Sequence, residues 1–307
     1  MNRRHKTHHR TITVDGTELF YRQAGNPQNP SMLLLHRYPS SSHMFRNVIE
    51  SLAESMHVVA PDLPGFGFSA APPPDQYTYT FENLSRTIER FLDAITVDRF
   101  FVYHFDFGTP IAYHLATRHP DRIRGMIVQN GNAHEAGLGP QWDAPKTFWS
   151  DPTPENKAKL GAWMNFEGNR AEYVGDLPDR IAELYPPECW HLDWQRLSRP
   201  GIIDIQFEIF CDYQNHVARF PAIERYHRKH QPPCLLLWGR HDAYFGLDEI
   251  MAYNRVLESL EIHVFDSGHF LLETHHMECA ALIAAFVSNV DAVSLSRPEP
   301  RGSAVGR

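Results

Sequence analysis

A sharp change of pattern around Asp106 constrains the fold of this chain more than any other feature. Residues Arg99 to Tyr103 predict a buried strand, His104 to Gly108 a tight turn, and Thr109 to His119 a helix. So short a turn between a strand and a helix lifts one side chain above the carboxyl end of the strand, beside the helix N-terminus. That side chain is Asp106, whose carboxylate is already ionised at pH 7 and could attack saturated carbon without help from a base.

Strands and helices alternate along most of the chain. This pattern predicts an α/β fold with a mostly parallel central sheet and helices on both faces. Strands at 10–14 and 19–23 flank Asp15-Gly16 and predict an N-terminal hairpin. We expect central strands at 32–35, 58–60, 101–103, 125–129, 234–238 and 262–265, and helices at 44–56, 81–95, 109–119, 247–257 and 274–289.

Between Asn132 and about Pro232 this alternation stops. We therefore divide the chain into a core of residues 10–131 and 233–289 and an inserted segment of residues 132–232, with a flexible N-terminus at 1–9 and a disordered tail at 290–307. Most of the tryptophans in the insertion should pack it onto the core, and one or two should face a ligand. They are Trp142, Trp149, Trp163, Trp190 and Trp194.

Composition excludes several classes of function. A net charge of -8 argues against a nucleic-acid surface. The basic residues of the first ten positions precede no apolar run, which argues against a secretory signal or a membrane anchor. The four cysteines lie far apart in sequence, which favours reduced thiols in a cytoplasmic protein and argues against a metal site. No motif implies a cofactor.

Five landmarks follow one another along the chain in a familiar order, and with them the chain resembles the α/β-hydrolase superfamily. Within it, the resemblance is to the branch of epoxide hydrolases and haloalkane dehalogenases, and it extends from about Arg10 to about Ser288. It implies an α/β-hydrolase fold in which the insertion is a helical cap. The landmarks are His36-Arg37-Tyr38-Pro39, Asp62-Leu63-Pro64-Gly65-Phe66-Gly67-Phe68-Ser69, the turn at Asp106, Gly239-Arg240-His241-Asp242 and Asp266-Ser267-Gly268-His269-Phe270.

The resemblance also implies roles for individual residues. Asp106 would attack the substrate and form an ester, and His269 would activate the water that hydrolyses it. Asp242 would orient His269, in the chain order nucleophile, acid, base. The backbone amides of Phe107 and Tyr38 would bind the oxyanion.

The first loop departs from the family pattern, because Arg37 follows His36 where a glycine is usual. If the backbone at Arg37 needs a positive φ, the side chain costs about 1 kcal/mol or more in strain and the oxyanion site is reshaped. Otherwise, Arg37 adds a cation near the pocket mouth. Both His36 and Arg37 are candidate substrate contacts, Tyr38-Pro39 is a candidate cis peptide, and His104 is a second departure.

Substrate class depends on the cap. Opening an epoxide needs an acid for the leaving oxygen, and the resemblance favours Tyr213, with Tyr173 and Tyr185 as weaker candidates. Releasing a halide needs N–H donors, which the side chains at Phe107 and Tyr38 lack, although a cap tryptophan such as Trp149 or Trp163 could supply one.

We therefore expect a cofactor-independent hydrolase that uses water to open a small, largely apolar electrophile, most readily an epoxide. A haloalkane dehalogenase is one alternative, and a non-hydrolytic or ligand-binding protein with an altered oxyanion loop is another. No nucleic-acid or membrane partner is expected, and a homodimer is left open.

Overall fold

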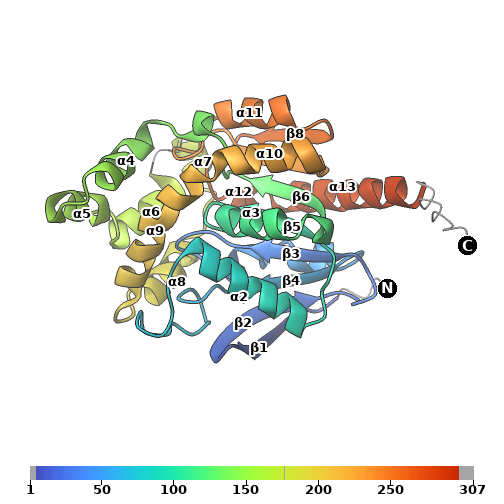
Figure 1. The fold of residues 1–307 in the computed structure, drawn as a ribbon, viewed down its shortest axis with the longest axis horizontal. Helices are drawn as coiled ribbons and strands as arrows, with labels where there is room; N and C mark the ends of the chain where they lie inside the picture. Colours follow the sequence, from blue (N-terminus) through green and yellow to red (C-terminus); the bar gives the residue numbers. More distant parts are fainter. Residues whose placement is uncertain (1–4, 176, 297–307) are drawn as a thin grey trace, which may run out of the picture.

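An eight-stranded sheet forms the centre of the molecule, in the order β1-β2-β4-β3-β5-β6-β7-β8 (Figure 1). The computed structural model describes residues 5–175 and 177–296, so the predictions for residues 1–4 and 297–307 lie outside the described part. β1 pairs antiparallel with β2 and β2 with β4, whereas the other neighbours pair in parallel, as predicted. The strands are β1 (His8–Val14), β2 (Thr17–Ala24), β3 (Ser31–Leu35), β4 (His57–Pro61), β5 (Phe100–Phe105), β6 (Ile123–Gln129), β7 (Cys234–Gly239) and β8 (Leu260–Phe265).

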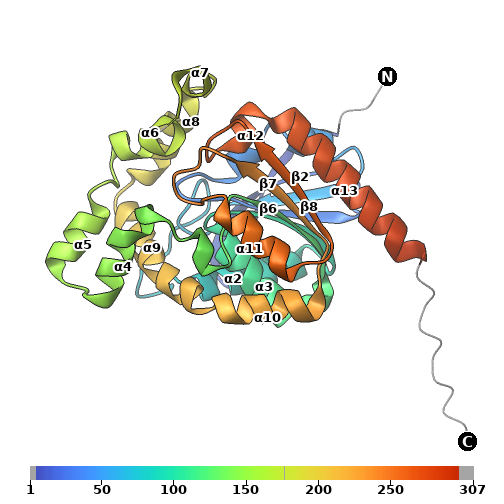
Figure 2. The same cartoon turned by 90° about the horizontal axis from the view of Figure 1, so that it is seen from above.

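Helices cover both faces of this sheet (Figure 2). The central strands β4, β5 and β7 are buried along their whole length, as parallel strands are when helices lie on both sides. Two apolar clusters fill the two interfaces, which confirms the predicted α/β architecture. One face carries α2 (Phe81–Ala94), α3 (Gly108–Arg118), α10 (Phe220–His230) and α11 (Asp248–Val256), and the other carries α1 (Ile49–Leu52), α12 (Leu271–Thr274) and α13 (His276–Ser296).

Several predicted boundaries are wrong. The expected helix at 44–56 is divided between a 3-10 turn, η1 (Ser42–Phe45), and α1, although its apolar residues are buried. Apolar spacing indicates which side of a segment faces the core and does not require continuous hydrogen bonding. α13 continues to Ser296, so residues 290–296 are helical, and β1 includes the last two residues of the expected flexible N-terminus.

The segment at 132–232 is helical and extends to one side of the sheet (Figures 1 and 2). α10, which the predicted boundary assigns to the cap, contacts α3 and α11 of the core, so that boundary falls one helix too late. We use "cap" below for the elements from η3 to α9. They are η3 (Glu135–Gly137), η4 (Pro140–Trp142), α4 (Asp143–Ser150), α5 (Pro154–Gly161), α6 (Phe166–Val174), α7 (Asp179–Ala182), α8 (Glu188–Leu197) and α9 (Ile202–Ala218).

The last helix, α13, is distinctive in composition. Among the described residues it alone is long and apolar enough, by length and composition, to cross a membrane. It packs against β6 and β7 of the sheet and against α1. Helices that cover a sheet meet the same two criteria, so the finding carries no further assignment.

Candidate active site

Asp106 occupies the sharp turn between β5 and α3. The turn is tighter than predicted, because His104 and Phe105 still belong to the strand. Asp106 has a φ of 48°, in the left-handed region that costs a side chain about 1 kcal/mol or more. The close approach of α3 to β3 depends on Gly108, since a Cβ there would lie 2.5 Å from the Leu35 carbonyl oxygen. The turn thus strains the backbone at Asp106 and places its carboxylate at the carboxyl end of β5.

The Asp106 carboxylate is buried and lies between two predicted partners. The backbone N–H of Tyr38 donates to its Oδ1 at 3.1 Å. His269 Nε2 lies 3.9 Å from Oδ2. Asp106 is only 7% exposed and His269 4%, so both groups face each other away from bulk water. The structure therefore brings together the predicted nucleophile, base and one oxyanion amide.

Asp242 fixes the orientation of the imidazole. Its Oδ2 lies 2.5 Å from His269 Nδ1, and its Oδ1 accepts backbone N–H groups of Tyr244 (2.7 Å) and Phe245 (3.2 Å). Because a carboxylate only accepts hydrogen bonds, Nδ1 carries a proton, and in the neutral tautomer with that proton Nε2 keeps its lone pair. Nε2 is buried without a hydrogen-bond partner among the described residues. A base is thus available on the side of the ring that faces Asp106.

The second predicted oxyanion donor, the amide of Phe107, directly precedes α3. The first N–H groups of a helix have no acceptor within the helix. The position of the Phe107 amide is compatible with binding the oxyanion, and that role stays a prediction.

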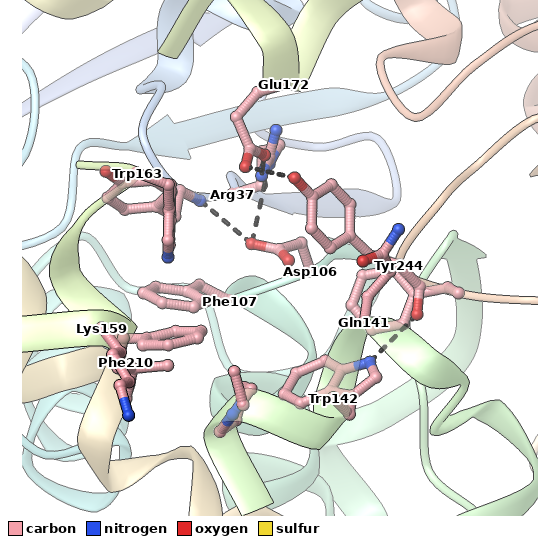
Figure 3. A pocket seen from close by; sticks show the side chains of 15 residues that line it. Arg37, Asp106, Phe107, Gln141, Trp142, Lys159, Trp163, Glu172, Phe210 and Tyr244 are labelled. Carbon is pink, nitrogen blue, oxygen red and sulfur yellow. Dashed lines mark hydrogen bonds and ion pairs between the residues drawn. The ribbon is translucent and has the colours of Figure 1, made fainter. Parts of the chain in front are cut away.

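The structure contradicts both of the alternatives that the sequence left open for Arg37. The backbone at Arg37 does not have a positive φ, so the prediction of a strained oxyanion loop is wrong. Arg37 is also 2% exposed, so it does not lie at the mouth of a pocket. Its Nε lies 3.6 Å from Asp106 Oδ1 and its Nη2 2.5 Å from Oε2 of Glu172, in the cap. The other Glu172 oxygen accepts the Tyr244 hydroxyl at 2.7 Å (Figure 3).

Burial and charge act in opposite directions on Arg37. Burial alone would lower the pKa of its guanidinium, but the carboxylates of Glu172 and Asp106 raise that pKa above its usual value. Arg37 is therefore a permanent cation beside Asp106.

Two histidines near this loop are structural. His36 was predicted to contact substrate, but it is fully buried outside the cavity: its Nε2 accepts the Leu63 N–H, and its Nδ1 contacts the Arg37 carbonyl oxygen at 3.0 Å. His104 lies beneath the turn with Nδ1 3.0 Å from Thr109 Oγ1, and burial lowers its pKa to about 3. Both rings are neutral and support the loop and the turn.

A cavity of about 320 Å³ lies next to Asp106 (Figure 3). Its polar side holds Arg37, Glu172 and Tyr244 next to the carboxylate, and its opposite wall is mainly apolar and aromatic. Such a cavity suits a small molecule that is apolar at one end. The apolar wall consists of Phe107, Trp142, Ala144, Pro145, Leu160, Trp163, Phe210 and Phe245.

Trp163 lines this cavity as predicted, but Trp149 does not, because it packs against Trp142 instead. The predicted acid Tyr213 is also outside the lining. It is fully buried on α9, packs against Trp142 and donates its hydroxyl to Asn132 Oδ1.

The two weaker candidates for the acid lie elsewhere as well. Tyr173 donates to Asp193 (2.5 Å), and the Tyr185 hydroxyl pairs with Ser267 (3.2 Å). Two tyrosines do line the cavity, Tyr38 and Tyr244, and the sequence reasoning missed Tyr244. Its position two residues after Asp242, in the same loop, is the signal that could have identified it. Glu172 lies within a cap helix and offered no such signal.

Comparison with known proteins agrees with this geometry. The family model described as alpha/beta hydrolase fold matches residues 30–276. The hydrolase YNR064C of Saccharomyces cerevisiae is 37% identical over 286 residues, which cover 92% of this chain and 97% of that protein. Epoxide hydrolase 3 of Mus musculus is 24% identical over 91% of this chain and 76% of its own length.

A further relative is a haloalkane dehalogenase of Bradyrhizobium diazoefficiens. It is 37% identical over 117 residues, or 38% of this chain and 37% of that protein. The relatives therefore include both epoxide hydrolases and haloalkane dehalogenases. The chain belongs to the alpha/beta hydrolase fold family, and it is a hydrolase.

Proposed function

We propose that this hydrolase opens small epoxides through a covalent ester on Asp106. One observation carries the proposal: a buried carboxylate stands in the nucleophile turn, 3.9 Å from an imidazole whose other nitrogen is held by Asp242. A serine at this position would have to lose a proton to the imidazole before attacking. A carboxylate is ionised already, which leaves His269 free to act in a second step.

In the first step, Asp106 Oδ2 attacks an epoxide carbon and the C–O bond to the ring oxygen breaks. Oδ2 is the better nucleophile of the two oxygens because Oδ1 accepts the Tyr38 amide. The leaving oxygen takes a proton from Tyr244, which lines the cavity on its polar side and donates its hydroxyl to Glu172 in the resting enzyme. Burial, followed by the charge of Glu172, raises the pKa of Tyr244, but an alkoxide is a stronger base than a phenolate. The hydroxyl exchanges its Glu172 acceptor for the substrate oxygen in this step.

In the second step, His269 Nε2 takes a proton from water and the resulting hydroxide attacks Cγ of Asp106. The Cγ–Oδ2 bond then breaks, and the product leaves with Oδ2 after taking the proton from the imidazolium. The new carboxyl group returns its proton to the Tyr244 phenolate. The net reaction is epoxide plus water to a diol, and Asp106 has gained one oxygen from water.

The shape of the cavity limits the substrate. Its volume fits a molecule of roughly ten non-hydrogen atoms at most, and its aromatic wall favours an apolar substituent. A haloalkane is the second candidate, because Trp163 lines the cavity and an indole N–H can bind a departing halide. Epoxides rank first since Tyr244 offers a proton, which a halide does not need.

The experiment is mass spectrometry of the His269→Gln variant after exposure to styrene oxide, hexene oxide or bromohexane. We expect an epoxide adduct on the peptide that contains Asp106, because attack proceeds while ester hydrolysis is blocked. The His269→Gln, Asp106→Ala double variant should give no adduct. An adduct with bromohexane alone would favour the second candidate, and no adduct with any of the three would refute the covalent mechanism.

A further inference from the structure

The buried guanidinium of Arg37 has N–H groups without acceptors. Its Nη2 is paired with Glu172, but Nε and Nη1 are both buried and make no hydrogen bond with the described residues. Leaving a buried donor unpaired destabilises a fold, so such a group calls for a function. Nε lies 3.6 Å from Asp106 Oδ1, just beyond hydrogen-bonding distance. The unpaired donor therefore stands next to an atom that changes its charge during the proposed reaction.

We propose that Arg37 is a further catalytic residue, a cationic donor that stabilises the oxyanion formed when the Asp106 ester is hydrolysed. The inference rests on the proposed covalent mechanism. Oδ1 accepts the Tyr38 amide and faces Arg37, whereas Oδ2 faces His269. Alkylation at Oδ2 leaves Oδ1 as the carbonyl oxygen of the ester. When hydroxide bonds to Cγ, the electron pair of that carbonyl moves to Oδ1, beside the guanidinium.

The charge on Asp106 changes twice in each cycle, and Arg37 responds differently to each state. In the resting enzyme, Arg37 faces two carboxylates, Glu172 and Asp106. In the ester, Asp106 is neutral, and the negative charges near Arg37 are those of Glu172 and of the Tyr244 phenolate that the first step leaves. In the tetrahedral intermediate, a full negative charge returns to Oδ1. Arg37 therefore stabilises the tetrahedral intermediate more than it stabilises the ester. Such a difference is what accelerates hydrolysis of the ester.

The surroundings of Arg37 hold the guanidinium in place. Glu172 binds Nη2, and its second oxygen is occupied by Tyr244. The ring of Phe270 lies below the cation, 4.5 Å from its central carbon to the ring centroid. Because the guanidinium is already held in position, little reorganisation of the site is needed when the oxyanion forms. This preorganisation is the source of its effect on the rate.

The test separates formation of the ester from its decay. Single-turnover experiments with whichever epoxide labels Asp106 follow the adduct by intact mass. Arg37→Met should form the ester at least as fast as the wild-type enzyme, because Asp106 loses a neighbouring cation. It should hydrolyse the ester more slowly, by on the order of 10- to 100-fold, so that the adduct accumulates. Arg37→Lys, which keeps the charge, should recover part of the loss.

Arg46→Met is the matched control. Arg46 forms a partly buried ion pair with Glu273 outside the cavity, so this variant loses an ion pair without changing the charge beside Asp106. Its ester should form and decay at wild-type rates.

Two results would overturn the role of Arg37. One is an Arg37→Met ester that decays at the wild-type rate. The other is slow decay that recovers when Glu172→Gln is added to Arg37→Met, because the defect would then come from the unpaired carboxylate. Absence of any adduct in the His269→Gln variant would instead refute the covalent mechanism itself, so the two failures are distinguishable.

Discussion

Replacing Asp242 with asparagine should strongly slow ester hydrolysis while leaving ester formation intact. The two oxygens of Asp242 have separate tasks: Oδ1 accepts the backbone N–H groups of Tyr244 and Phe245, and Oδ2 binds His269 Nδ1. An asparagine in the same position keeps its carbonyl oxygen toward the two backbone donors. Its NH₂ group then points at Nδ1 and forces the ring proton onto Nε2, where no lone pair is left to activate water.

The size of this effect follows from the alternative orientation of the amide. Turning the carbonyl toward Nδ1 restores the active tautomer, but it sets NH₂ against two partly buried N–H groups that lose their acceptor. Each unsatisfied group costs about 1–3 kcal/mol, so the active form lies about 2–6 kcal/mol higher. At 1.4 kcal/mol for each factor of ten, ester hydrolysis should slow by roughly 30-fold to 10⁴-fold.

Rapid-quench mass spectrometry distinguishes the two steps in the Asp242→Asn variant. The adduct should form within about threefold of the wild-type rate, because His269 takes no part in the attack, and it should then persist. Asp266→Asn is the control: Asp266 is an exposed carboxylate outside the cavity that pairs with Arg180 on α7 and with Arg240 and His241. It should leave both steps unchanged. Wild-type decay of the ester in Asp242→Asn would refute the assignment of His269 as a base oriented by Asp242.

Three further predictions test other parts of the structure. Tyr244→Phe should slow ester formation with an epoxide by roughly 10²-fold or more in single-turnover assays, since it removes the acid, whereas Tyr213→Phe should have a much smaller effect because its hydroxyl lies outside the cavity. Gly108→Ala should lower the free energy of unfolding in urea by about 1–3 kcal/mol, because the new methyl group meets a backbone oxygen of β3 at 2.5 Å. Gly139→Ala, with nothing within 4 Å, should change it little. Burial raises the pKa of Asp193 to about 7, above its unfolded value, so this carboxyl stabilises the fold at low pH and loses that contribution as pH rises from about 4 to about 7. Asp193→Asn should remove this part of the pH dependence in denaturation curves, and an unchanged slope would contradict it.

The features predicted correctly from sequence are those that depend on the ends of strands. Asp106 and Asp242 follow the buried strands β5 and β7, and His269 follows the edge strand β8. Parallel strands bring their carboxyl ends to one edge of the sheet, so the meeting of these three residues requires no knowledge of side-chain packing. Elements without that constraint were placed less well. The apolar spacing at 44–56 identified a buried face but not the break in the helix.

Cap residues were predicted poorly because each depends on how a helix is rotated about its axis. Tyr213 and Trp149 lie on cap helices, and a turn of about 100° from one residue to the next decides whether a side chain meets the cavity or the core. The resemblance placed Tyr213 by its distance from Asp242 along the chain, which says nothing about that rotation. Tyr244 reaches the cavity from a core loop, whose position is fixed by the sheet.

Arg37 links the two parts of the molecule in a way that a search for motifs along the sequence does not reveal. Its counter-ion Glu172 lies 135 positions later, on α6 of the cap. Lifting α6 would separate a buried ion pair, which costs about 3–5 kcal/mol when one charge is left unpaired. On the side of α4 and α5, by contrast, the cavity is bordered by the exposed side chains of Gln141 and Lys159. Movement there breaks no buried charge pair. We therefore expect access along that side to be the lower-energy route, with α6 holding Arg37 near Asp106.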